Sequence, residues 1–228
     1  MRRRRCELDV WWRFGLAVVG AVFRACFRVR VTGIERVPER GAAILAGNHV
    51  SGLDGVVVAL VVGRFRGRMT RFLAAAEFFE RFPVSWGLRI YRQIPLRRGS
   101  SDVRALDEAI RTIRSGALAG IFPEGGVNPD PEAGLQRGRR GLARIALASG
   151  APVIPVGIWG TQRRWPRSGL HLHPPLRTVV AIAFGDPVPA RGDVASADDV
   201  RRFTDLVMAH IAEQTAKARS LAEPWKPV

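Results

Sequence analysis

The fold is decided by residues 42–54, AAILAGNHVSGLD, in which an unbroken apolar run passes directly into polar residues. Residues 42–47 carry no charge and have the length of a strand that is buried on both faces, which is typical of a parallel sheet. Residues 55–62 follow as a second apolar run, which we interpret as a helix. Asn48 and His49 therefore stand at the carboxyl end of a buried strand, where open α/β sheets bind their ligands.

The alternation of strand and helix continues on both sides of this stretch. We expect further strands over residues 30–32, 71–75, 118–122, 152–159 and 179–184, and further helices over residues 102–114, 138–149 and 198–221. This order predicts a single α/β domain with a central, mostly parallel sheet flanked by helices. The longest irregular stretches, residues 125–137 and 161–177, are long enough to be active-site or docking loops.

Composition limits the class of protein. Hydrophobic residues make up 47% of the 228, and the formal net charge of +16 favours polyanionic partners such as anionic membranes, nucleic acids or phosphate-bearing substrates. Cys6 and Cys26 form neither a disulfide framework nor a CxxC metal pattern, so we expect a reducing cytoplasm. His171 and His173 lack a third ligand at a suitable spacing, and we expect no metal and no bound cofactor.

Residues 1–28 are predicted to bind the surface of a membrane. A run of four arginines, residues 2–5, precedes an amphipathic helix with two tryptophans at its start and arginines along one face. The apolar run at residues 14–23 has half of the ~20 residues that a spanning helix needs. We therefore expect a peripheral or monotopic protein, held by anionic lipids on the cytoplasmic face of the plasma membrane, with its functional domain over residues 29–228. The alternative is an ordinary helix whose apolar face packs into the domain core.

His49 and Asp54 are the first candidate pair for catalysis. Their spacing across a strand-to-helix turn allows the carboxylate to accept a hydrogen bond from one imidazole nitrogen while the other nitrogen faces a substrate. Imidazole changes its charge near neutral pH, so it suits a base that takes a proton from an alcohol. The alternative is that Asp54 only caps the following helix and His49 is a surface loop residue.

Three more segments carry groups that suit binding or catalysis. Residues 122–126, FPEGG, place a carboxylate and two glycines directly after a buried strand, where the backbone can turn sharply and approach a ligand. Residues 94–99, IPLRRG, form a basic turn whose guanidinium groups can hold a phosphate. Residues 153–161, VIPVGIWGT, are a further buried strand that leads into a glycine turn.

Taken in their order along the chain, the four segments resemble the four sequence blocks of the glycerolipid acyltransferase family. Residues 48–54 are similar to its His-x4-Asp block, 94–99 to the second block, 122–126 to the Phe-Pro-Glu-Gly block and 153–156 to the apolar-Pro block. The resemblance covers residues 31–161. It implies transfer of an acyl group from acyl-CoA or acyl carrier protein to the hydroxyl of a lysolipid, with the thioester as co-substrate and no acyl-enzyme.

The resemblance also implies roles for individual residues. His49 would be the general base that deprotonates the acceptor alcohol, and Asp54 would orient it. Glu124 and Gly125 would shape the acceptor pocket, and Arg98 would match the phosphate-binding arginine of the second block. Backbone N–H groups at the start of the helix after His49 would be the oxyanion donors.

The chain departs from the family pattern around the acceptor. Gly126 and Val127 stand where the family usually has Thr-Arg, Ala75 stands where it has a lysine, and Arg97 replaces an Asp or Asn. We include Ser51, Arg97 and Gly126 among the predicted substrate-binding residues. Candidates to replace the missing cations are Arg97, Arg137, Arg139 and Arg140.

The identity of the acceptor stays open at this point. Lysophosphatidic acid is the first candidate, and another lysophospholipid or a glycolipid hydroxyl is the alternative. Two alternative hypotheses for the function are a basic nucleic-acid-binding protein and a non-catalytic, membrane-tethered protein. The arginines are scattered rather than striped and no nucleic-acid-binding motif is present, so we expect no nucleic-acid partner. The intact His49, Asp54, Arg98 and Glu124 argue against a non-catalytic protein.

Overall fold

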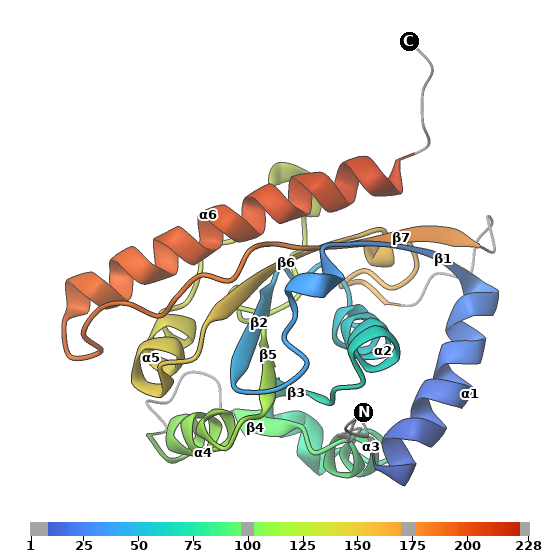
Figure 1. Cartoon of the computed structure of the whole chain (residues 1–228). Coiled ribbons are helices and arrows are strands. Elements are labelled where there is room, and N and C mark those ends of the chain that lie inside the picture. The colour runs from blue at the N-terminus through green and yellow to red at the C-terminus, as the bar shows by residue number, and fades with distance from the viewer. Residues whose placement is uncertain (1–8, 97–102, 170–176, 224–228) are drawn as a thin grey trace, which may run out of the picture.

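The computed structural model describes residues 9–96, 103–169 and 177–223, which form an α/β domain around one seven-stranded sheet (Figure 1). The strand order is β1-β7-β6-β2-β5-β3-β4, and every neighbouring pair is parallel except β6 and β7. The predicted fold, a mostly parallel sheet flanked by helices, is therefore confirmed.

The elements have the following bounds. The strands are β1 (Phe27–Thr32), β2 (Ala43–Gly47), β3 (Thr70–Ala75), β4 (Ile94–Leu96), β5 (Leu118–Ile121), β6 (Val153–Trp159) and β7 (Thr178–Phe184). The α-helices are α1 (Val10–Cys26), α2 (Asp54–Arg66), α3 (Val84–Ile90), α4 (Val103–Arg114), α5 (Gly141–Ser149) and α6 (Ala197–Ala222). Short 3-10 turns are η1 (Ile34–Arg36), η2 (Ala76–Glu80), η3 (Pro131–Ala133) and η4 (Thr161–Arg163).

Helices cover the sheet on both faces, and β2 lies at its centre. Successive residues of a strand point to opposite faces, so Ile44 packs into the core beneath α4, α5 and α6, whereas Leu45 packs into the core beneath α2. Every residue of β2 is buried. This explains why the strand reads as a continuous apolar run, and it places the carboxyl end of β2 between those of β5 and β6.

Two elements are absent from the sequence-based prediction. Helix α3 has seven residues and contains Gly87, and β4 has three residues, one of which is Pro95. Neither is long enough to show a helical or alternating period. Strand β1 also begins at Phe27, directly after α1, so residues 27 and 28 of the predicted membrane-binding segment lie in the sheet.

Helix α1 divides its apolar residues between two surfaces. Trp12 and Phe23 are buried against the domain, and Trp12 meets Tyr91 edge-on at 5.3 Å between ring centroids. Six large apolar side chains are exposed instead: Val10, Trp11, Phe14, Val18, Val19 and Val22. Across the described residues, no helix combines the length and the apolar character needed to span a bilayer.

Candidate functional site

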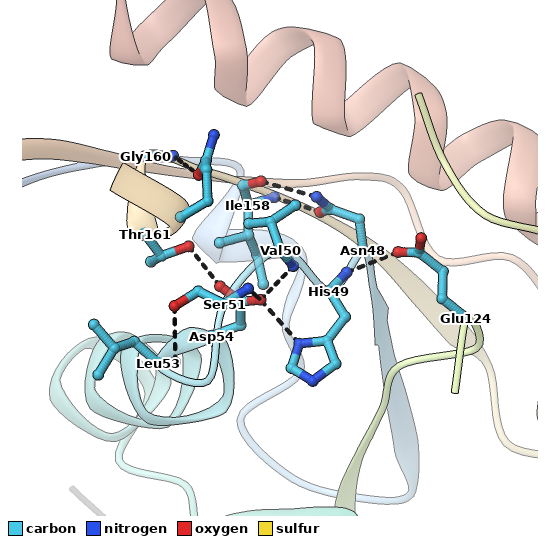
Figure 2. Close-up of polar contacts among 11 residues, drawn as sticks. Asn48, His49, Val50, Ser51, Leu53, Asp54, Glu124, Ile158, Gly160 and Thr161 are labelled. Atoms are coloured by element: carbon cyan, nitrogen blue, oxygen red, sulfur yellow. Dashed lines mark hydrogen bonds and ion pairs between the residues drawn. The ribbon is translucent and has the colours of Figure 1, made fainter. Parts of the chain in front are cut away.

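The candidate site lies where β2, β5 and β6 end side by side. His49 follows β2, Glu124 follows β5, and Thr161 follows β6 (Figure 2). Because β2 pairs in parallel with both neighbours, their carboxyl ends meet at one edge of the sheet. Segments that are 37 to 112 residues apart in the sequence therefore contribute polar groups to one place.

Asp54 is the buried acidic centre of this site. Its side chain has no solvent exposure, and it begins α2. Oδ2 accepts hydrogen bonds from the backbone N–H groups of Val50 (2.7 Å) and Ser51 (2.8 Å), and Oδ1 accepts one from the Thr161 hydroxyl (2.6 Å). These donors replace the water that a carboxylate loses on burial. Asp54 therefore does more than cap a helix, because it also contacts the imidazole.

His49 is held on two sides. Its Nδ1 lies 3.0 Å from Oδ2 of Asp54, and its ring stacks on Phe122 at 4.2 Å between centroids, with 9° between the planes. In the tautomer that carries its hydrogen on Nδ1, the imidazole donates to this carboxylate and Nε2 has a free lone pair. Figure 2 shows the second ring nitrogen pointing away from Asp54. This is the geometry of a histidine base oriented by a carboxylate.

Glu124, which follows β5, stabilises the turn at His49. It is 3% exposed, and its two oxygens accept hydrogen bonds from the backbone N–H groups of His49 (2.8 Å) and Gln136 (2.8 Å). Burial raises the pKa of the Glu124 carboxyl above its usual value, and the two backbone hydrogen bonds oppose that shift. With both oxygens accepting backbone hydrogen bonds, Glu124 holds the turn at His49 and the loop at Gln136 in place.

The other predicted site residues take different positions. Gly125 and Gly126 line the cavity beside His49, and Gly125 has φ +77°, a left-handed conformation that favours glycine. Ser51 is fully buried, and its hydroxyl accepts a hydrogen bond from the N–H of Leu53. The structure thus places Ser51 inside the turn and not on the cavity wall. Arg97 and Arg98 lie outside the described residues, as do His171 and His173.

Three polar residues of the site escaped the sequence-based prediction. Asn48 joins β2 to β6, because its amide donates to the Ile158 carbonyl (2.9 Å) and accepts from the Ile158 N–H (2.7 Å). Thr161 contacts Asp54, and the N–H of Asn128 donates to the carbonyl of His49 at 2.7 Å. All three are buried. A polar residue at the end of a buried strand was the signal that could have found Asn48 and Thr161.

An apolar cavity of about 560 Å³ adjoins His49. Its wall comes from α1, α2, α3 and the ends of β3 and β5, with Leu16, Ala59, Leu60, Phe72, Leu88 and Phe122 among the side chains. The volume lies within the range of about 300–1,000 Å³ that is typical of small-molecule sites. A hydrocarbon chain is a ligand that such a wall can accommodate with its reactive end at His49.

The cavity and its surroundings have no arrangement typical of a metal centre. Within residues 9–96, 103–169 and 177–223, no group of three or more His, Cys, Asp or Glu side chains is placed to hold a metal ion.

Comparison with known proteins identifies the family. A family model described as Acyltransferase matches residues 28–159, more than half of the chain. The chain belongs to the acyltransferase family. The match includes all four sequence blocks, and it confirms the resemblance to glycerolipid acyltransferases that these blocks indicated.

Relatives of this acyltransferase-family chain come from bacteria and plants. An uncharacterized protein of Mycobacterium tuberculosis is 31% identical over 209 residues, which covers 77% of this chain and 56% of that protein. The 1-acyl-sn-glycerol-3-phosphate acyltransferase of Borreliella burgdorferi is 25% identical over 164 residues, which covers 68% of this chain and 64% of the relative. The chain spans about half the length of several curated relatives that it matches.

A solved structure shares the fold. The crystal structure of the 1-acyl-sn-glycerophosphate (LPA) acyltransferase PlsC from Thermotoga maritima matches with a TM-score of 0.69 at 24% identity. The alignment covers 100% of this chain and 86% of that protein. Among the residues that the structure describes, the shared fold therefore extends beyond the region that the family model matches.

Proposed function

We propose that this chain is an O-acyltransferase that moves a fatty acyl group from a thioester, acyl-CoA or acyl carrier protein, to the hydroxyl of a lysophosphatidic acid-type acceptor. One observation carries the proposal: His49, oriented by the buried Asp54, lines an apolar cavity large enough for a lipid chain. A base beside such a cavity suits a reaction that joins an alcohol to a fatty acyl group. Named relatives in the family act on the same class of acceptor.

In the proposed mechanism, Nε2 of His49 takes the proton of the acceptor hydroxyl as its oxygen attacks the thioester carbonyl. Asp54 accepts the hydrogen bond from Nδ1 and stabilises the imidazolium that forms. Backbone N–H groups at the start of α2, where Gly55 lines the cavity, stabilise the tetrahedral oxyanion. The carbon–sulfur bond then breaks, and the imidazolium returns the proton to the leaving thiolate.

The acceptor is proposed as a lysophosphatidic acid-type molecule because the family relatives with printed activities are 1-acyl-sn-glycerol-3-phosphate acyltransferases. Another lysophospholipid or a glycolipid hydroxyl is the alternative for the same chemistry. This alternative is favoured by the replacement of the family's Thr-Arg by Gly126 and Val127, which removes one cation from the acceptor side.

The protein is also proposed to work at a membrane surface, as a peripheral or monotopic protein on the cytoplasmic face of the plasma membrane. Support comes from the exposed apolar stripe of α1 and from a second exposed group in the segment from η2 to α3. In that segment Phe82 is 85% exposed and Trp86 is 60% exposed. Helices α1 and α3 both line the cavity, so a lipid bound there would lie next to this apolar surface.

Thiol release from palmitoyl-CoA, measured with purified protein and a panel of acceptors, tests the proposed reaction. The panel holds lysophosphatidic acid, a lysophospholipid, a mannolipid and no acceptor, each with wild type and His49→Ala. We expect acceptor-dependent release that falls by about 10²–10⁴ in the variant, which is the usual contribution of a general base. Arg191→Ala, which changes an exposed arginine in the segment between β7 and α6, is the matched control.

Two results would contradict the proposal. One is acceptor-dependent release that the His49→Ala variant retains, because the base would then be another group. The other is the absence of release with every acceptor when both palmitoyl-CoA and a palmitoyl carrier protein are supplied.

A further inference from the structure

This chain lacks an arginine that the family usually carries shortly after the Phe-Pro-Glu-Gly block. Where the family usually continues Phe-Pro-Glu-Gly with Thr-Arg, this chain has Gly126 and Val127. A lysophosphatidic acid-type acceptor carries its phosphate close to the reacting hydroxyl, so the anion must lie within a side chain's reach of His49. Among the described residues, Arg139 is the one Lys or Arg that lines the cavity containing His49.

Arg139 packs against residues 122–126, the turn that follows β5 and binds the backbone of His49. Its backbone N–H donates to the carbonyl of Pro123 at 2.7 Å, and its side chain lies against Gly125. A Cβ atom at Gly125 would be 2.2 Å from Nε of Arg139, so any other residue there would displace the guanidinium from this position. The neighbouring Glu124 binds the N–H of His49. The backbone N–H groups of Arg139 and His49 thus both donate to the turn that follows β5, at Pro123 and Glu124 respectively.

Arg139 also borders a second hollow of about 580 Å³, which Glu124 lines as well. Four arginines and two acidic residues line this hollow: Arg137, Arg139, Arg140, Arg201, Glu124 and Asp205. Both oxygens of Glu124 accept backbone hydrogen bonds, and Arg201 pairs with Asp198 at 2.9 Å. We call this group of residues the arginine hollow. Its charge balance is positive, next to the catalytic turn.

Three of these cations have no acidic partner within the part of the chain that the structure describes. Arg137, Arg139 and Arg140 are exposed, and they form no ion pair with any described carboxylate. A guanidinium group binds a phosphate through two parallel hydrogen bonds, and such charge-assisted bonds are roughly twice as strong as neutral ones. The arginine hollow therefore has the charge and the donors that a phosphate group requires.

We propose that Arg139 binds the phosphate of the acceptor lipid, with Arg137 and Arg140 of the arginine hollow adding to the positive field, and so replaces the cation missing after Phe-Pro-Glu-Gly. This inference rests on the proposed function, because it assigns the headgroup site of that same reaction. The donor also carries phosphate if it is a coenzyme A thioester. The same guanidinium could in chemical terms serve either substrate, so the experiment separates the two.

Steady-state kinetics of Arg139→Ala, Arg139→Lys and wild type test the assignment. The control is Arg144→Ala, because Arg144 is an exposed arginine on α5 that lines neither the cavity nor the arginine hollow. Loss of a hydrogen bond to a charged group costs about 1.5–3 kcal/mol. We expect KM for lysophosphatidic acid to rise about 10- to 100-fold in Arg139→Ala, with partial recovery in Arg139→Lys and no change in Arg144→Ala. KM for palmitoyl-CoA should stay within about twofold.

Two kinetic results would overturn the inference. An unchanged KM for lysophosphatidic acid in Arg139→Ala would show that the phosphate is bound elsewhere. A rise in KM for palmitoyl-CoA instead would assign Arg139 to the donor. A phosphate-free acceptor, monoacylglycerol, should be used equally by wild type and Arg139→Ala, and a parallel loss with this acceptor would show a general defect of the site.

A binding measurement separates failure of this inference from failure of the proposed function. Titration calorimetry with glycerol 3-phosphate needs no turnover, and we expect Arg139→Ala to lose binding that wild type and Arg144→Ala retain. If no acyl transfer occurs but this difference is found, the phosphate site stands and the reaction is wrong. If acyl transfer occurs but the three proteins bind glycerol 3-phosphate equally, the reaction stands and the phosphate site is wrong.

Discussion

Replacement of Asp54 by Asn should separate the charge of this residue from its hydrogen bonds. With the amide oxygen in the position of Oδ2, the group still accepts from the N–H groups of Val50 and Ser51 and from His49. The amide NH₂ then faces Thr161, whose hydroxyl oxygen can accept a hydrogen bond. The turn is therefore expected to keep its shape, and the negative charge beside the imidazole is removed.

The magnitude follows from the geometry of the pair. Nδ1 of His49 lies 3.0 Å from Oδ2, which puts the centres of the two charges about 4 Å apart. At an effective dielectric constant of about 20, an imidazolium and a carboxylate at that separation attract by about 4 kcal/mol. Loss of this attraction in the transition state corresponds to a fall in kcat of about 10³-fold.

Thiol release at saturating substrate measures kcat, and thermal unfolding checks the fold. Asp54→Ala is the contrasting variant, because it leaves the buried N–H groups of Val50 and Ser51 without an acceptor, at about 1–3 kcal/mol each. Asp54→Asn should therefore unfold close to the wild-type temperature, whereas Asp54→Ala should unfold clearly below it. A kcat of Asp54→Asn within tenfold of wild type would refute the argument that the charge stabilises the imidazolium.

Two further predictions concern Thr161 and the exposed aromatic residues. Thr161→Val removes the hydroxyl that donates to Oδ1 of the buried Asp54, so the free energy of unfolding in urea should fall by about 1.5–3 kcal/mol. Thr161→Ser keeps a hydroxyl and should stay near the wild-type stability. Equal stability of the valine and serine variants would contradict this prediction. The double variant Phe82→Ser with Trp86→Ser should bind anionic vesicles at least tenfold more weakly in a sedimentation assay, since each buried aromatic side chain contributes about 1.5–3 kcal/mol. Leu206→Ser, a change of an exposed apolar residue on α6, is the control, and an equal effect of this control would exclude a specific membrane-binding surface.

Much of the candidate site was predictable because its residues follow buried strands directly. The apolar runs at residues 43–47, 118–121 and 153–159 are local signals, and a polar residue at the end of such a run must lie at the edge of the sheet. His49 and Glu124 were found in this way, Asp54 was found from its spacing to His49, and the order of the four blocks indicated the family.

Short elements and partners distant in sequence were not predictable in this way. Helix α3 and strand β4 are too short for a periodic pattern, and tertiary packing supports them. Thr161 lies 107 residues from Asp54, so nothing local identifies it as the donor to that carboxylate. The same holds for Arg139: the sequence offered it as one of four candidate cations, and its position against Gly125 is a product of the folded loop.

By itself, the sequence determined the alternation of strand and helix, the candidate pair His49 and Asp54, and the family, because each depends on short patterns and their order along the chain. The tertiary structure decided which groups satisfy the buried carboxylates, which arginine borders the cavity, and which apolar residues of α1 face the domain or the solvent. These outcomes depend on the order of the strands in the sheet and on how the loops pack on it. Hydrogen bonds and burial join residues by distance in space, and a one-dimensional pattern carries no record of that distance.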